Sequence, residues 1–157
     1  MQMTLDRSFR VRELQVRFKA TRYKSPAKIT SPQDVHEFLL PMIKQQPRER
    51  LISIALTSGN QVIGFEIVSQ GTSNASMAVA SEVFKAVLLT NATAFILAHN
   101  HPSGNCEPSR EDRQTAEGFS EAARLIGVEF LDFIIVTEDS FYSFAQSEPS
   151  IIKKGGV

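Results

Sequence analysis

One apolar run, and the helix that follows it, constrain the fold more than any other part of the chain. The run Thr93-Ala-Phe-Ile-Leu-Ala98 has the length and composition of a buried strand, and it leads directly into His99. After a short loop, Ser109 has the properties of a helix N-cap, and the pattern predicts a helix through about Ile126 with Gly127 as its C-cap. A buried strand, a loop and a long helix in this order are typical parts of a layered α/β domain.

The rest of the chain mixes helical and strand patterns. The sequence Ser-Pro-Gln-Asp at 31–34 supplies a capping residue, a proline at the first helical position and an acid in the first turn, so it predicts a helix over 31–46. Strands are expected over 51–57, 61–69, 128–136 and 141–144, a second helix over 81–89, and an irregular loop over 70–80. The first two strands form a hairpin. This order predicts an α/β layered domain with a mixed, largely antiparallel sheet.

Length and composition describe one ordinary globular domain. The chain has 157 residues, of which 42% are hydrophobic and 22% charged, so disordered, collagen-like and coiled-coil classes are set aside. We expect the domain over residues 31–146 and a loosely held tail over 147–157. The apolar runs are much shorter than the ~20 residues that cross a bilayer, and the start has no signal-peptide hydrophobic region. The expectation is therefore a cytoplasmic protein with no membrane contact.

Residues 1–30 form a basic arm, although the formal net charge of the whole chain is zero. Between residues 1 and 28, Asp6 and Glu13 are outnumbered by Lys and Arg: Arg7, Arg10, Arg12, Arg17, Lys19, Arg22, Lys24 and Lys28. Apolar side chains at 14, 16 and 18 alternate with polar ones at 15, 17 and 19, which favours a strand with its charges toward solvent. The alternative is contact with nucleic acid or an acidic partner.

Two histidines and an aspartate suggest a metal site. In an extended chain His99 and His101 face the same side, so both rings can reach one ion, and Asp112 in the first turn of the next helix is a plausible third ligand. Three protein ligands leave zinc an open position, as catalytic sites do. Each feature also has an ordinary explanation, since strand-end histidines often only form hydrogen bonds and Ser109-x-x-Asp112 is a helix-capping pattern. Their joint occurrence favours the metal site.

The same segment resembles a known family. His99-Asn-His-Pro-Ser-Gly followed by Glu107-Pro-Ser-Arg-Glu-Asp112 resembles the JAMM motif of the MPN-plus metallopeptidases, and within them the bacterial RadC type. Weaker similarity covers about residues 47–146. The resemblance implies a JAMM/MPN domain with a cytidine-deaminase-like layered fold. It also implies one zinc ion per chain, held by His99, His101 and Asp112, and hydrolysis of a peptide or isopeptide bond in a protein or peptide substrate.

The family motif also requires an upstream glutamate that acts as the general base. Glu49 and Glu82 are both candidates, and we favour Glu49 because it stands just before the predicted strand that begins at Leu51. Glu82 stands at a helix start, where the helix dipole already favours an acid. By the resemblance, Glu49 moves the proton, while Ser109 helps to hold the developing oxyanion or serves only as an N-cap.

Two other functions are alternatives to hydrolysis. The first is a DNA-associated repair or recombination accessory protein, or a nuclease, which the naming of the RadC branch and the basic arm support. The second is a metal-free scaffold, which is disfavoured because all the motif's ligands are present. A zinc deaminase is excluded, since its Pro-Cys-x-x-Cys ligand pair is absent and Cys106 is the only cysteine. We interpret His36 and Cys106 as lying outside the site, and the sequence indicates neither a substrate nor an oligomeric state.

Overall fold

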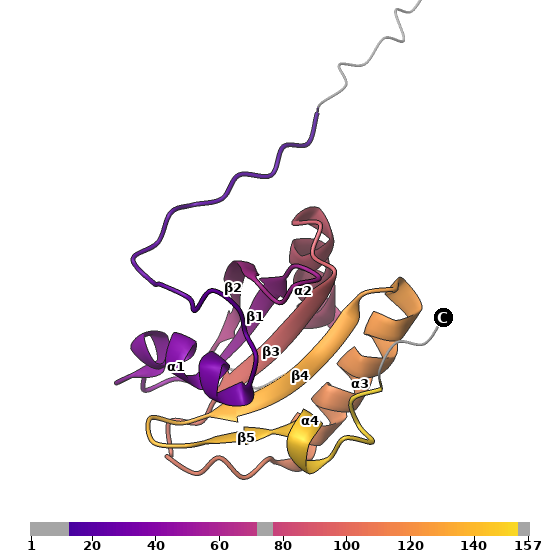
Figure 1. Ribbon diagram of the computed structural model, residues 1–157. Helices are drawn as coiled ribbons and strands as arrows, with labels where there is room; N and C mark the ends of the chain where they lie inside the picture. The colour runs from indigo at the N-terminus through magenta and orange to yellow at the C-terminus, as the bar shows by residue number, and fades with distance from the viewer. Residues whose placement is uncertain (1–12, 72–76, 154–157) are drawn as a thin grey trace, which may run out of the picture.

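The computed structural model describes residues 13–71 and 77–153 (Figure 1). Its helices and strands follow the order expected from the sequence. They are α1 (Pro32–Ile43), β1 (Arg50–Leu56), β2 (Val62–Gln70), α2 (Met77–Leu89), β3 (Ala94–Asn100), α3 (Arg110–Ile126), β4 (Glu129–Val136), β5 (Phe141–Ser143) and α4 (Phe144–Ser147). None of the helices in this part of the chain has both the length and the apolar character that a membrane span needs.

The five strands form one sheet with the order β2-β1-β3-β4-β5. Only β3 and β4 are parallel, and α3 is the helical crossover between them. All other neighbours are antiparallel. Helix α1 packs on one face of the sheet, while α2 and α3 pack on the other (Figure 1). The predicted α/β layers and the mixed, largely antiparallel sheet are confirmed.

The central strands are buried on both faces, so their side chains divide between two cores. In β3, Phe95 and Leu97 point into the core under α2 and α3, whereas Ile96 and Ala98 point into the core under α1. Burial on both faces explains why this strand reads as a continuous apolar run. Because side chains alternate along a strand, the next odd-numbered residue, His99, faces the α3 side of the sheet.

Helix ends follow the capping signals in the sequence. Ser31 and Ser109 both form capping boxes. In each, the serine hydroxyl accepts from the backbone N–H of the aspartate three residues later, and the side chain of that aspartate accepts from the backbone N–H of the serine. At the other end of α3, Gly127 adopts a left-handed conformation with φ 80°, which favours glycine. These ends fix where α3 begins relative to β3.

Two of the expected elements were wrong. Residues 14–19 form no strand: they are exposed and pair with no strand among the described residues, so the backbone ladder that a strand requires is missing. Helix α2 begins at Met77 and not at Ser81, inside the segment interpreted as a loop. Alanine is a strong helix former, so the Ala-rich composition there was misread as loop. Residues 72–76 of that predicted loop lie outside the described residues.

The predicted loose tail is also corrected for its first part. Residues 144–147 form the short helix α4, and Ile152 is buried in the core under α3. The backbone N–H of Lys153 donates to the Ser120 hydroxyl in α3 over 2.8 Å. Burial of an isoleucine side chain and this hydrogen bond hold the segment against α3. Residues 154–157 lie outside the described residues.

Candidate metal centre

The two histidines lie together at the carboxyl end of β3. The strand ends at Asn100, but the backbone N–H of His101 still donates to the Val136 carbonyl of β4 over 3.0 Å, so the chain stays close to the sheet. The rings of His99 and His101 have centroids 5.0 Å apart and planes at 87°. Their side chains are only 10% and 14% exposed. The expected placement on one side is therefore found.

The first turn of α3 brings a carboxylate to both rings. Oδ1 of Asp112 lies 2.9 Å from Nδ1 of His99, and Oδ2 lies 3.5 Å from Nε2 of His101. Each of the three residues offers one ligand atom, and these atoms all lie within 4.8 Å of one another. Two imidazole nitrogens and one carboxylate oxygen are ligand atoms of the kind that catalytic zinc sites use. This group of side chains could hold a metal ion.

The protonation state of Asp112 suits a metal ligand. Burial alone raises the pKa of Asp112, but hydrogen bonds from His101, His99 and Ser109 outweigh it and hold the pKa well below the usual value. The hydrogen bond to Asp112 also raises the pKa of His101, against the opposing effect of burial. The carboxylate is therefore ionised throughout the physiological pH range, as a metal ligand must be.

Of the two candidate glutamates, the structure brings Glu49 to this group. Glu49 immediately precedes β1, and the pairing of Leu51 with His99 carries it alongside β3. Its Oε2 lies 3.6 Å from Nε2 of His99, and its side chain is 41% exposed. Glu82 instead lies in α2, where its carboxylate pairs with Lys85 at 2.6 Å.

Asn100 is a residue whose contribution the sequence analysis missed. It is 3% exposed, and its Oδ1 accepts from the backbone N–H of Arg50 over 2.7 Å. Its Nδ2 donates to the backbone carbonyl of Arg48 over 3.3 Å. The Asn100 side chain thus holds the backbone of Arg48 and Arg50, the two residues that flank Glu49. The available signal was a polar residue directly after an apolar run, and the sequence pattern placed it in the loop that follows the strand, whereas the structure has it as the last residue of β3.

Ser109 stands directly beside the candidate ligands. Its hydroxyl donates to Oδ2 of Asp112 over 2.6 Å and accepts from the backbone N–H of Asp112 over 3.1 Å. Its own backbone N–H also donates to Oδ2, over 2.7 Å. The capping role is therefore present, and the oxyanion role stays a prediction.

Arg113 is a second residue whose position was not anticipated. Its Nη1 donates to the Pro108 carbonyl over 2.9 Å, just before Ser109. Its Nε donates to both carboxylate oxygens of Glu148, over 3.1 and 3.2 Å, and Glu148 also accepts from the Tyr142 hydroxyl over 2.7 Å. This network ties the start of α3 to β5 and to the end of α4.

The remaining histidine and the cysteine lie outside the group. Nε2 of His36 lies 2.9 Å from the Thr137 carbonyl, and its ring packs against Phe141. Cys106 is half-buried, and its sulfur accepts from the Ser140 hydroxyl over 3.4 Å. Both placements agree with the interpretation made from the sequence.

Comparison with known proteins identifies the family. A family model described as the RadC-like JAB domain matches residues 29–149. A UPF0758 protein of Methanosarcina barkeri is 40% identical over 116 residues, which are 74% of this chain and 51% of that protein. One from Symbiobacterium thermophilum is 43% identical over 118 residues, 75% of this chain and 50% of its own length. The chain thus spans about half the length of these two relatives. It belongs to the RadC-like JAB domain family.

Proposed function

We propose that this domain is a zinc-dependent hydrolase of the JAMM type that cleaves a peptide or isopeptide bond. The observation that carries the proposal is the convergence of two imidazoles and one carboxylate within 4.8 Å, with the carboxylate of Glu49 beside them. The three side chains are mostly buried, whereas Glu49 is half-exposed. A buried ligand set with an accessible carboxylate at its rim is the arrangement that a hydrolytic site needs.

The proposed ligands are His99, His101 and Asp112. A zinc ion held by them would polarise the scissile carbonyl and lower the pKa of the attacking water. Glu49 is the general base: its carboxylate takes one proton from that water and then delivers it to the leaving amine nitrogen, so that it ends ionised as it began. Its half-exposed position lets it meet water and substrate. Asp112 is a poor proton acceptor, because its hydrogen bonds hold its pKa well below the usual value.

Ser109 is proposed to stabilise the oxyanion that develops on the substrate carbonyl. In the structure its O–H points to Asp112, so this role requires the hydroxyl hydrogen to turn toward the substrate. A hydroxyl has two acceptor lone pairs besides its donor, so Ser109 can turn its hydrogen and still accept from the Asp112 N–H. One donor aimed at an oxyanion contributes about 3 kcal/mol in studied enzymes.

The two glutamates give a matched test of the proposal. Glu49→Gln and Glu82→Gln make the same chemical change, one beside the candidate ligands and one on the surface of α2. The zinc-loaded proteins are incubated with a mixture of linear peptides and lysine-branched isopeptides, and cleavage is followed by mass spectrometry. We expect Glu82→Gln to match the wild type and Glu49→Gln to keep zinc while losing about 10²–10⁴ in rate. Failure of the zinc-loaded wild type to cleave any of these amides, or equal rates in Glu49→Gln, would contradict the proposal.

A second candidate function is contact with nucleic acid through the arm. Residues 13–28 contain one acidic residue, Glu13, and five exposed basic residues: Arg17, Lys19, Arg22, Lys24 and Lys28. Binding through such charges weakens steeply with salt, because it releases counterions. Fluorescence anisotropy with a duplex DNA at several salt concentrations tests it. Affinity that does not fall with salt, or that survives Arg22→Glu with Lys24→Glu, would argue against this function.

A further inference from the structure

A small pocket, here called the His101 pocket, opens at the carboxyl ends of the parallel strands β3 and β4. Its volume is about 200 Å³, and it lies between the loop after β3, the turn between β4 and β5, and the end of α1. Ligands of α/β sheets commonly bind just outside the carboxyl ends of parallel strands. His101 belongs both to this pocket and to the candidate metal group. The pocket therefore adjoins the place where a scissile amide would lie.

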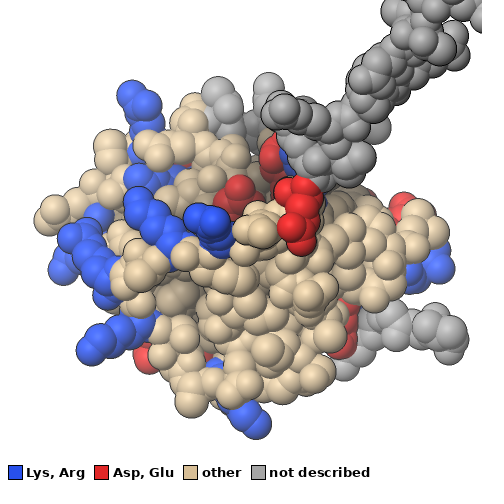
Figure 2. Space-filling model, turned by 90° about the horizontal axis from the view of Figure 1, so that it is seen from above, with Lys and Arg blue, Asp and Glu red and all other residues tan. Residues whose placement is uncertain are grey.

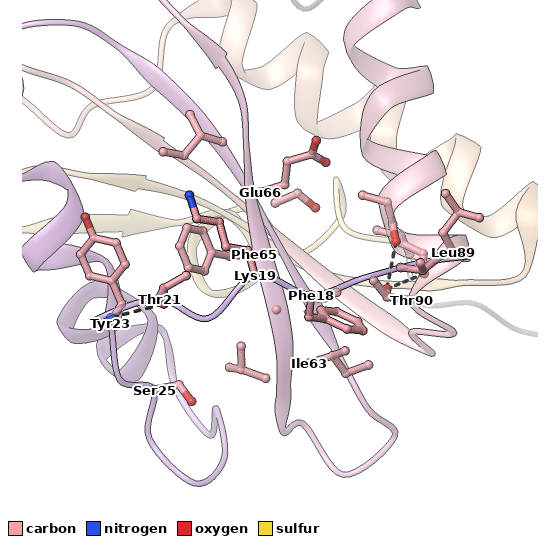
Figure 3. Close-up of a pocket in the computed structure, with 18 of the residues that line it drawn as sticks. Phe18, Lys19, Thr21, Tyr23, Ser25, Ile63, Phe65, Glu66, Leu89 and Thr90 are labelled. Atoms are coloured by element: carbon pink, nitrogen blue, oxygen red, sulfur yellow. Dashed lines mark hydrogen bonds between the residues drawn. The ribbon is translucent and has the colours of Figure 1, made fainter. Parts of the chain in front are cut away.

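A larger groove lies in a different part of the molecule. Its volume is about 700 Å³, and it runs between the arm, β2 and α2, with Phe18, Ile63 and Leu89 on its walls (Figure 3). The chain's own arm already lies along it, since Cε1 of Phe18 is 3.6 Å from where a Cβ at Gly64 would stand. None of the candidate metal ligands lines this groove. Of the two cavities, the His101 pocket is the one that can take part of a substrate held at the metal group.

The size and walls of the His101 pocket limit what it can hold. Sites that enclose a whole drug-sized molecule measure about 300–1,000 Å³, so a pocket of about 200 Å³ suits a single side chain. Ile43, Pro102 and Val136 are among its lining residues, and part of the lining is apolar. An apolar wall fits the methylene stem of a long side chain whose polar head reaches a wetter place.

The charges in the lining are all negative. Glu138 and Asp139 are both exposed and stand next to each other in the turn after β4. Oε1 of Glu138 accepts from the backbone N–H of Gln45 over 2.8 Å, which anchors this carboxylate at the end of α1. In the part of the chain that the structure describes, no lysine or arginine forms an ion pair with either acid. A recess lined by charges of one sign concentrates ions of the opposite sign.

The lack of cations in this lining differs from the surface at large. On the face shown in Figure 2, lysine and arginine side chains gather mainly toward one side. None of the described lysines or arginines lines the His101 pocket. Arg50 is held through its backbone by Asn100, but its Nη1 donates to the Met42 carbonyl over 3.0 Å, so its guanidinium is engaged under α1. The pocket is thus an acidic recess on a surface of mixed charge.

We propose that the His101 pocket is a substrate subsite that binds the lysine or arginine side chain of a residue close to the scissile amide. The stem of that side chain lies along the apolar part of the wall, and its cationic head lies beside Glu138 and Asp139. The inference rests on the proposed hydrolase, because it needs an amide held at the candidate ligands. It identifies basic peptides as the substrate class, with the two acids as residues that determine specificity.

A peptide series tests the subsite. Linear peptides and lysine-branched isopeptides carry lysine, norleucine or glutamate at single positions near the cleaved amide, which mass spectrometry locates. Norleucine keeps the stem of lysine and lacks the ammonium group. We expect the zinc-loaded full chain to prefer lysine over norleucine by about tenfold to hundredfold in kcat/KM at one of these positions, since a hydrogen bond to a charged group contributes that much.

Two variants and a control assign the preference to the pocket. Glu138→Gln with Asp139→Asn should abolish the preference for lysine, and Glu138→Gln with Asp139→Lys should turn it into a preference for glutamate. Both acids are exposed, and glutamine can still accept from the Gln45 N–H, so both variants should fold. Glu117→Gln with Glu121→Lys makes the second charge change at exposed positions of α3 outside the pocket and should keep the wild-type preference.

Binding is followed separately by NMR, so that the subsite and the hydrolase can fail independently. The ¹⁵N-labelled wild type is titrated with acetyl-Ala-Lys-Ala-amide or its norleucine analogue, and only the lysine peptide should shift the amide signals of Gly104 and Asp139. Cleavage with equal kcat/KM for lysine and norleucine, or a lysine preference that both pocket variants retain, would overturn the subsite and leave the hydrolase in place. Lysine-selective shifts without any cleavage would contradict the hydrolase alone, and the absence of both would overturn both.

Discussion

The side-chain amide of Asn100 accepts a hydrogen bond from the backbone N–H of Arg50 over 2.7 Å. This contact extends the pairing of β1 with β3 to the segment that carries Glu49. The carbonyl of Glu49 is held in turn by the N–H of Gly71 over 2.9 Å. The backbone at the proposed general base is therefore held from two sides, by Asn100 and by Gly71.

Asn100→Ala should slow hydrolysis and leave zinc binding intact. The substitution leaves the Arg50 N–H without its partner, which costs about 1–3 kcal/mol of stability, and frees the segment that holds Glu49. A displacement of about 1 Å can cost about 10² in rate. Asn100→Asp keeps the acceptor for the Arg50 N–H, so its rate of hydrolysis should fall less than that of Asn100→Ala. Steady-state kinetics with parallel zinc determination checks this; a normal rate constant in Asn100→Ala would show that Glu49 needs no such support.

Ser109→Ala and Ser31→Ala should separate capping from chemistry. Both serines close capping boxes with an aspartate, so each substitution should lower the free energy of unfolding by about 1 kcal/mol. Only Ser109 adjoins the candidate ligands, and only its loss should reduce the rate of hydrolysis. Urea unfolding and kinetics are measured on both variants. Equal activity in the two would leave Ser109 as a helix cap alone.

Arg113→Met should weaken zinc binding by roughly tenfold, since partners outside the ligand set tune metal affinity. The arginine holds the Pro108 carbonyl and Glu148 together, and both bonds fix the start of the helix that carries Asp112. Arg113→Lys keeps the charge but not the forked geometry, so its zinc affinity should lie between those of the wild type and Arg113→Met. Lys85→Met, which breaks the surface pair with Glu82, is the control. Zinc titration with a competing chelator reads out the affinity, and identical values for the Arg113 and Lys85 variants would refute the role.

Asp132 should make the protein more stable in mild acid. Burial raises its pKa to about 6 from the usual 3.8, against hydrogen bonds from Ser143 and the Ala145 N–H. Because the folded-state pKa is the higher one, this contribution is fully present below about pH 4 and is lost as the pH rises through 6. The shift corresponds to about 2–3 kcal/mol.

The comparison with Asp132→Asn isolates this group from other titrating residues. The amide can still accept from the Ala145 N–H and can donate to the Ser143 hydroxyl. Urea unfolding from pH 4 to pH 7 should show the wild type losing stability relative to the variant across this range. Parallel curves for the two proteins would mean that Asp132 titrates near its usual value.

The sequence was most informative where local patterns and tertiary packing agree. The strand through Ala98, the cap at Ser109 and the glycine at 127 each carry a strong local signal, and together they determine how β3 and α3 meet. The convergence of His99, His101 and Asp112 follows from this placement of β3 beside the start of α3. The choice of Glu49 over Glu82 rests on the family resemblance and not on any local pattern. The pairing of Leu51 with His99 brings Glu49 beside the candidate ligands, and its role as general base stays a prediction.

Interactions between distant segments could not be read from the sequence. Asn100 holds residues about fifty positions away, and Glu148 lies 35 positions from Arg113, so no periodicity connects them. The strand expected at 14–19 failed for a related reason. Its alternation is a real strand signal, but a strand also needs backbone hydrogen bonds to a neighbouring strand, and the pattern of one segment does not reveal whether those bonds form.

The zinc content of the purified wild type beside Asp112→Ala tests the account most directly. The Asp112 carboxylate touches both histidines, so its removal takes one of three proposed ligands and leaves the two rings in place. Atomic emission spectrometry should find one zinc per wild-type chain and close to none in the variant. A variant that keeps a full equivalent of zinc, or a wild type that binds none when zinc is supplied, would contradict the assignment of this centre.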